Sequence, residues 1–147
     1  MYSTRTGLIF GFHGCDESVR DEVVAKKGVV LTPSCNDYDW LGSGIYFWEN
    51  NYYRALEFAK FLKVHPHNPK HRIKTPSVIG AVIDLGYCLD LLDSENLELL
   101  KIGYDMLVEA NKKSGYDMPK NVPLGKDGDL LLRYLDRAVI EQIHEFN

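Results

Sequence analysis

Short apolar runs bounded by glycine or proline alternate along this chain with segments of helical periodicity. Runs at residues 7–14, 29–32 and 44–48 have the length and composition of strands. The run at residues 78–85 (Val-Ile-Gly-Ala-Val-Ile-Asp-Leu) is the strongest buried-strand signal in the chain. The alternation of strands and helices predicts an α+β or α/β fold in a single domain spanning residues 1–147.

Capping residues and helical spacing predict four helices. Asp16 caps a first helix with Val19, Val23 and Val24 on one face, and Gly28 is its expected stop. A second helix follows an Asn50 or Asn51 cap, with Ala55, Leu56, Ala59 and Leu62 at helical spacing. A third runs from about Ser94 to Lys113 and is capped by Asp93 or Ser94, and a last one begins near Gly128, with Leu131, Leu132, Leu135, Val139 and Ile143.

Composition and charge narrow the class of protein. The 147 residues carry a net charge of −4, which argues against a protein that grips duplex nucleic acid by neutralising phosphates. Cys15, Cys35 and Cys88 are an odd number of cysteines without metal-ligand spacing, so we expect free thiols in a reducing compartment. No signal peptide or membrane span is evident, and a cytoplasmic location is the expectation.

The stretch Trp40–Glu49 (Trp-Leu-Gly-Ser-Gly-Ile-Tyr-Phe-Trp-Glu) has the character of a pocket floor and rim. Two glycines allow close approach of the backbone to a ligand, and the aromatic residues behind them offer flat faces to a ring. His13-Gly14, at the end of an earlier predicted strand, is the expected opposite wall.

These motifs, in this order, resemble those of ADP-ribosyltransferases. His13-Gly14, the Gly-x-Gly-Ile-Tyr-Phe strand of residues 42–47 and the Ala-x-x-Phe-Ala helix of residues 55–59 are similar to the His-Tyr branch, which includes poly-ADP-ribose polymerases and diphtheria-type toxins. Residues 39–42, 47–49 and 135–140 are most similar to small bacterial members. The main match covers about the first 60 residues.

The resemblance implies a split β-sheet fold that binds NAD in a cleft. It implies that His13 bonds the adenosine ribose, that the backbone of Gly14 binds the nicotinamide amide, and that Tyr46 stacks on the nicotinamide ring. Each residue also has a plainer interpretation: His13 taken alone is more typical of a core histidine bonded to backbone, and Tyr46 of a core residue, whereas Gly14 and the glycines before Tyr46 favour the ligand roles.

The third catalytic position of that family, usually Glu, lies on a strand well after the Tyr strand. No such strand is evident before Asn147, so the resemblance predicts a truncated, cleaved or naturally short form. Glu49 is the substitute candidate, although strand alternation points it away from Tyr46, and a solvated strand end or a pair with Arg54 is the competing interpretation.

Further candidate NAD-binding residues surround these motifs. They are Thr32, Ser34, Gly44, Phe47 and Phe58. The hydroxyls of Thr32 and Ser34 suit a phosphate or ribose but are equally typical of turns, and Phe58 is expected chiefly to pack its helix on the sheet.

Three histidines, His65, His67 and His71, lie in a segment rich in proline and basic residues. Prolines interrupt them and no Cys or acidic ligand accompanies them, so an exposed basic loop is expected and no metal. With Lys63, Lys70, Arg72 and Lys74 this loop is a candidate patch for an anionic substrate, and an RNA-binding domain is a third functional hypothesis. Glu141 and Glu145 are expected to lie on a solvated helix face.

The leading hypothesis is an NAD-dependent ADP-ribosyltransferase that releases nicotinamide and modifies a macromolecular acceptor, a protein or a nucleic acid. A bacterial toxin or phage-defence role, with an antitoxin partner or a missing C-terminal segment, fits the resemblance by analogy. The alternative is a catalytically degenerate NAD-binding or interaction module.

Overall fold

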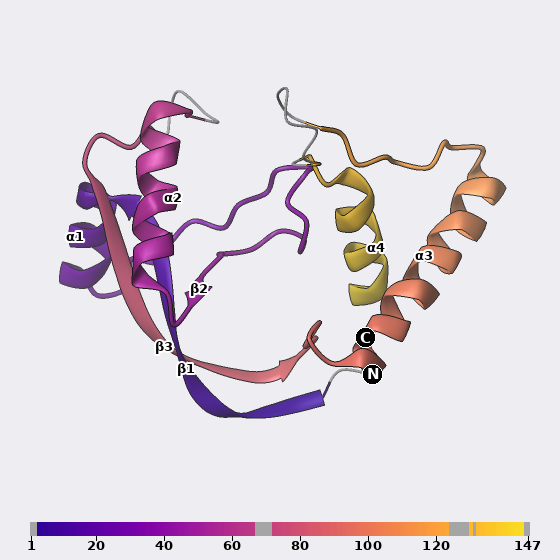
Figure 1. Cartoon of the computed structure of the whole chain (residues 1–147), viewed down its shortest axis with the longest axis horizontal. Coiled ribbons are helices and arrows are strands. Elements are labelled where there is room, and N and C mark those ends of the chain that lie inside the picture. Colours follow the sequence, from indigo (N-terminus) through magenta and orange to yellow (C-terminus); the bar gives the residue numbers. More distant parts are fainter. Residues whose placement is uncertain (1–2, 67–71, 124–129, 131, 146–147) are drawn as a thin grey trace. The chain divides into compact units, whose positions relative to one another are not determined.

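The computed structural model describes residues 3–66, 72–123, 130 and 132–145, with side chains described from Gly7 onward. These residues form an α+β fold with a three-stranded antiparallel sheet, in the order β2-β1-β3, and four helices (Figure 1). The elements in chain order are β1 (Ser3–Asp16), α1 (Glu17–Ala25), β2 (Trp48–Glu49), α2 (Tyr52–Val64), β3 (Pro76–Cys88), α3 (Ser94–Ser114) and α4 (Tyr134–His144).

The chain divides into two compact units. The unit that we call the sheet unit comprises Arg5–Thr32 and Ile45–Gly86, and thus most of the sheet with α1 and α2. The helical unit comprises the described residues of Met1–Thr4, Pro33–Gly44 and Tyr87–Asn147, with α3 and α4. The expectation of one domain over the whole chain stays a prediction.

In the sheet unit, β1 is the central strand and carries the core. Cys15 at its end is buried with Leu31 and Ile79, and Val23 and Phe47 pack against them. On the other side of the strand end, Ala55 and Ala59 of α2 are fully buried. Small side chains therefore allow this helix to lie close to the strand.

The helix caps expected from the sequence are confirmed. The side chains of Asp16, Asn51 and Asp93 accept bonds from the backbone N–H groups of Ser18, Arg54 and Glu95, each at the N-terminus of its helix. Gly28 adopts a positive φ of 86°, but α1 ends three residues earlier, at Ala25. None of the α1 residues is fully buried: Val19 and Val24 are exposed, and Val23 packs, partly buried, against the core.

Of the predicted strands, the one at residues 29–32 is wrong and the one at residues 44–48 is shorter than expected. Residues 29–32 form no strand, and Leu31 reaches the core through its side chain while its backbone stays outside the ladder. The expected strand at residues 44–48 is reduced to an isolated bridge, Ser34 with Gly44, and to the two-residue β2. An apolar run reports burial of side chains, and burial does not require backbone pairing.

The strand predicted at residues 78–85 is confirmed and is longer, but it is buried on one face only. Ser77 and Ile79 of β3 are buried, whereas Gly80, Val82 and Asp84 are exposed. The period of two in burial is that of a sheet with one face in the core.

In the helical unit, α3 packs on α4 through a glycine. A Cβ at Gly103 would lie 2.6 Å from Cγ1 of Ile143, and Val139, Ile140 and Ile143 of α4 are buried. The helix expected from Gly128 begins only at Tyr134, because Leu132 bridges to Val122 in extended conformation. Residues 124–129 and Leu131 lie outside the described residues.

The first turn of α4 is capped by a residue from another segment of the chain. Its N-cap residue, Arg133, makes no side-chain cap bond, and Asn121 supplies one instead. Oδ1 of Asn121 accepts from the backbone N–H of Leu135 at 2.9 Å, and its amide donates to Asp136 at 2.6 Å. A residue distant in sequence thus satisfies the first turn of the helix.

Candidate functional site

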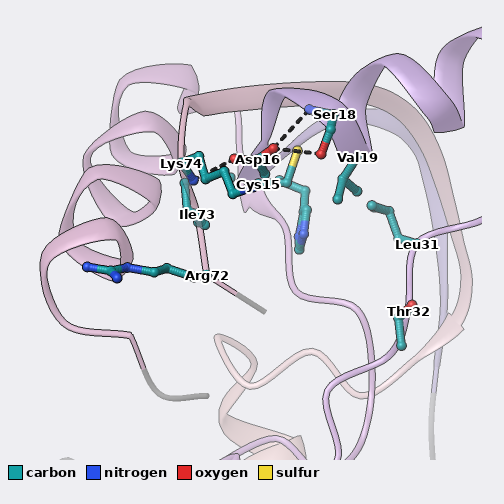
Figure 2. Close-up of a pocket in the computed structure, with 11 residues that line it drawn as sticks. Cys15, Asp16, Ser18, Val19, Leu31, Thr32, Arg72, Ile73 and Lys74 are labelled. Carbon is teal, nitrogen blue, oxygen red and sulfur yellow. Dashed lines mark hydrogen bonds between the residues drawn. The ribbon is translucent and has the colours of Figure 1, made fainter. Parts of the chain in front are cut away.

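The end of β1 opens into a cavity of about 450 Å³ that lies wholly within the sheet unit (Figure 2). Its volume falls in the range of small-molecule sites. It is lined by His13, Gly14, Cys15, Asp16, Ser18, Val19, Leu31, Thr32, Arg72, Ile73 and Lys74. Three of the residues predicted from the sequence, His13, Gly14 and Thr32, are therefore brought to one cavity.

His13 links the two motif segments. Its Nδ1 lies 2.8 Å from the backbone oxygen of Tyr46, and its ring lies 5.7 Å from that of Phe47. A carbonyl oxygen only accepts, so Nδ1 is the donor of this bond, and Nε2 is the ring nitrogen left for a ligand. The arrangement combines the two interpretations of His13, because the ring is held by backbone and still lines the cavity.

Gly14 is required by the close approach of α2. A Cβ at this position would overlap the backbone oxygen of Ala55 and would lie 3.1 Å from Cβ of Ala59. The absence of a side chain is therefore explained by packing on α2, whether or not the backbone of Gly14 also binds a ligand.

Asp16, at the end of β1, connects the cavity wall to the segment that carries Arg72 and Lys74. Its carboxylate accepts from the hydroxyl and N–H of Ser18, and from the N–H groups of Lys74 and Thr75 at 2.6 and 2.9 Å (Figure 2). The bond from the Ser18 hydroxyl, and then those from the backbone N–H groups, hold the pKa of Asp16 well below its usual value. The carboxylate is thus committed to structure.

The residues that follow α2 in the sequence give the cavity a cationic edge. Arg72 and Lys74 line it, and Figure 2 shows them on the segment that leads into β3. Thr32 and Leu31 form another part of the wall. The cavity therefore combines an imidazole, the hydroxyl of Thr32 and two cations with the Asp16 carboxylate and the Ser18 hydroxyl, which are bonded to each other. The imidazole, the Thr32 hydroxyl and the cations suit a polar anionic ligand.

Burial also affects the thiol of Cys15. Desolvation, and next the neighbouring Asp16 carboxylate, raise its pKa, so the thiol stays protonated at neutral pH. A protonated, buried thiol suits a structural role, and all three cysteines are free thiols in the structure, as expected.

Tyr46 and Glu49 contribute less to the cavity than expected. Tyr46 supplies its backbone oxygen to His13, and neither Tyr46 nor Glu49 is among the lining residues. Glu49 is exposed and pairs with Gly11 in the β1–β2 register. Among the described lining residues, Asp16 is the one carboxylate.

The remaining candidates lie elsewhere. Phe58 packs edge-on to Trp48 with ring centroids 6.1 Å apart, outside the cavity. Ser34 and Gly44 belong to the helical unit, where their backbones exchange two hydrogen bonds of 2.8 and 3.0 Å. The Ser34 hydroxyl donates to Asp39 at 2.6 Å, which is the turn role considered for it.

One expectation about α4 needs correction. Of the two residues expected on a solvated face, Glu145 is exposed, whereas Glu141 is only partly exposed and its carboxylate accepts from the N–H of Ser43 at 3.2 Å. Arg137 donates to the backbone oxygen of Asn36 and to Oγ of Ser43. One face of α4 thus holds the loop of residues 33–44. The sequence indicated this contact only through the i, i+4 spacing of Arg137 and Glu141.

The described residues show neither a group of metal ligands nor a helix that could cross a membrane. No group of three or more His, Cys, Asp or Glu residues there is arranged to hold a metal ion, and His67 and His71 lie outside the described residues. The described helices are all too short or too polar to cross a bilayer.

Comparison of the chain with family models, with curated proteins and with solved structures found no match. Its function is therefore argued from the cavity and its surroundings.

Proposed function

We propose that this protein is an NAD-dependent ADP-ribosyltransferase whose dinucleotide binds in the cavity at the end of β1. The observation that carries the proposal is the 2.8 Å bond between His13 and the backbone oxygen of Tyr46. It joins the two segments whose motifs resemble the His-Tyr branch of ADP-ribosyltransferases, and one of them, through His13, lines the cavity.

The chemistry of the lining supports a dinucleotide. With Nδ1 committed to Tyr46, Nε2 of His13 accepts from a ribose hydroxyl, and the hydroxyl of Thr32 adds a donor and an acceptor. Arg72 and Lys74 complement the charge of a pyrophosphate, Arg72 through its planar fork and Lys74 as a point charge.

The proposed reaction breaks the bond between the nicotinamide nitrogen and ribose C1′, and both electrons leave with the neutral nicotinamide. A nucleophilic oxygen or nitrogen of the macromolecular acceptor forms the new bond to C1′ and releases its proton to a base or to water. The developing positive charge on the sugar is stabilised by a nearby carboxylate. Glu49 is the candidate, through a rearrangement of the short strand β2.

A second function is favoured by one specific observation. Asp16 is the one carboxylate among the described lining residues, and its oxygens already accept four hydrogen bonds. A cavity that binds NAD without a free carboxylate suits a catalytically degenerate binding module.

Nicotinamide release and NAD affinity, measured on the same preparations, distinguish these functions. If the protein is the enzyme, the wild type releases nicotinamide, and the rate of release falls at least about tenfold in Glu49→Gln and in Tyr46→Ala. Tyr53→Ala, at an exposed tyrosine of α2, is the matched control and should keep full activity. Binding of NAD by calorimetry without release supports the module. No binding by a folded wild type contradicts both.

A further inference from the structure

The segment that carries the two cations of the cavity is fastened through its backbone to the end of β1. The N–H groups of Lys74 and Thr75 donate to Oδ2 of Asp16 at 2.6 and 2.9 Å. In the reverse direction, the N–H of Glu17 donates to the backbone oxygen of Thr75 at 2.9 Å. Three hydrogen bonds thus join two stretches of chain that are about 60 residues apart.

Side chains hold the same segment from within. Ile73, between the two cations, is 8% exposed, and Nη1 of Arg20 donates to Oγ of the buried Ser77 at 2.9 Å. Arg72 and Lys74 are exposed residues that line the cavity (Figure 2). The two charged side chains therefore extend from a backbone that is anchored on both sides of Lys74.

The two oxygens of the Asp16 carboxylate have separate partners. Oδ1 accepts from the N–H and the hydroxyl of Ser18 and so caps α1, whereas Oδ2 accepts the two bonds from Lys74 and Thr75. Serine and aspartate are about equally favourable at an N-cap, so the cap does not require the second oxygen. By charge alone, moreover, a carboxylate on the wall of a cavity weakens the binding of an anion.

We propose that Asp16 is a positioning residue for the phosphates of the ligand, and that through Oδ2 it sets where Arg72 and Lys74 meet them. The inference rests on the proposed function for its ligand, a dinucleotide whose pyrophosphate lies at this edge of the cavity. Cations on a backbone that is already ordered lose less conformational entropy when they bind an anion. This gain outweighs the repulsion between Asp16 and the ligand.

The test is calorimetry at low salt with inorganic pyrophosphate and NAD as separate probes. Asp16→Ser keeps an oxygen for the cap of α1 and removes Oδ2, and we expect it to weaken the binding of both probes about tenfold. Charge alone predicts tighter binding, because the substitution removes a negative charge from the wall. Asp93→Ser is the matched control, since Asp93 caps α3 and does not line the cavity, and it should leave both affinities unchanged.

Two further measurements separate positioning from a general loss of stability. Exchange of the Lys74 and Thr75 amides in heavy water, followed by NMR, should accelerate in Asp16→Ser more than exchange of the amides of α2. Lys74→Gln removes the charge and keeps the backbone N–H. In that background Asp16→Ser should weaken pyrophosphate binding at most about threefold, because part of its effect acts through the lysine.

Glu17→Pro serves if Asp16→Ser does not fold. Proline is favoured at the first position of a helix, and the extended conformation of Asp16 (φ −74°, ψ 147°) is compatible with a following proline. The substitution removes the bond from Glu17 to Thr75 and leaves the carboxylate of Asp16 in place. We expect it to weaken pyrophosphate binding about threefold, as the loss of one neutral hydrogen bond.

Three results would overturn the proposal. They are equal or tighter pyrophosphate binding by both Asp16→Ser and Glu17→Pro, an equal effect of Asp16→Ser with and without the Lys74 charge, and no pyrophosphate binding by the folded wild type. NAD binding by the wild type alongside any of these leaves the proposed function standing. The expected pyrophosphate results in a protein that does not bind NAD would support the positioning role and contradict the proposed function.

Discussion

The two units secure their loops in different ways. In the sheet unit, one carboxylate at the junction of β1 and α1 binds the backbone N–H groups of a segment about 60 residues later, and a glycine lets α2 lie against the strand. In the helical unit, long side chains of α4, Arg137 and Glu141, reach the loop of residues 33–44.

This difference between the units affects how well each tolerates substitution and which of them can hold a functional site. Direct backbone contacts leave no room for adjustment, whereas long, partly exposed side chains such as Arg137 and Glu141 give way. The cavity lies in the unit with the rigid construction, as expected for a site whose groups must be held in place. The comparison leads to four predictions.

The largest effect is expected at Gly14. A Gly14→Ala Cβ overlaps the backbone oxygen of Ala55, which cannot move without displacing α2. We expect the free energy of unfolding, measured in urea, to fall by about 3 kcal/mol or more. Gly44→Ala is the control, because its Cβ would meet nothing within 4 Å, and it should stay within about 0.5 kcal/mol. Equal effects would contradict the difference between the units.

Asp16→Asn should come next, at about 2 kcal/mol at neutral pH, because the carboxylate caps α1 and holds two further N–H groups. The pKa of Asp16 is lowered in the folded state, so the unfolded chain takes up the proton first as the pH falls.

The contribution of Asp16 is therefore complete above its unfolded pKa of about 3.9 and is lost progressively below it. Urea titrations at several pH values should show a constant difference between wild type and Asp16→Asn from pH 5 to 8 that shrinks below about pH 4. A difference that grows toward low pH would show that the carboxylate is not stabilising.

Gly103→Ala tests packing in the helical unit, where the obstacle is a side chain. The Cβ would meet Cγ1 of Ile143 at 2.6 Å, but alanine also raises helix propensity by about 1 kcal/mol, so we expect a net loss of only about 1 kcal/mol. Ile143→Ala removes Cγ1, so in the double variant the loss measured by thermal unfolding should be smaller than the sum of the two single losses. Strict additivity of the two changes would rule out their contact.

The smallest effect is expected at Arg137. Arg137→Lys keeps the charge but loses the planar fork that bonds Asn36 and Ser43, and should cost about 0.5–1 kcal/mol. Trp40, in the loop of residues 33–44, reports the change, so its acrylamide quenching in a Trp48→Phe background should increase. Lys101→Arg, on α3, should leave quenching unaltered.

Much of the local structure was predictable from the sequence. Asp16, Asn51 and Asp93 mark helix N-termini because a short polar side chain satisfies the first N–H groups with atoms that are adjacent in the chain. The strand at residues 78–85 was predictable because its apolar run is long and β-branched. His13 and the Tyr46 segment were correctly expected to lie together, through the order of their motifs.

Tertiary structure alone decided the rest, because it depends on contacts between residues far apart in the chain. The cap of α4 comes from Asn121, the basic edge of the cavity from residues about 60 positions after His13, and the reason for Gly14 from the backbone of α2. Hydrophobic periodicity records which side chains avoid water but not which backbone groups meet. The motifs could therefore indicate His13-Gly14 as one wall of a pocket, but no residue of the expected floor, Trp40–Glu49, lines the cavity, and the Asp16 carboxylate that holds its basic edge in place gave no signal of this role.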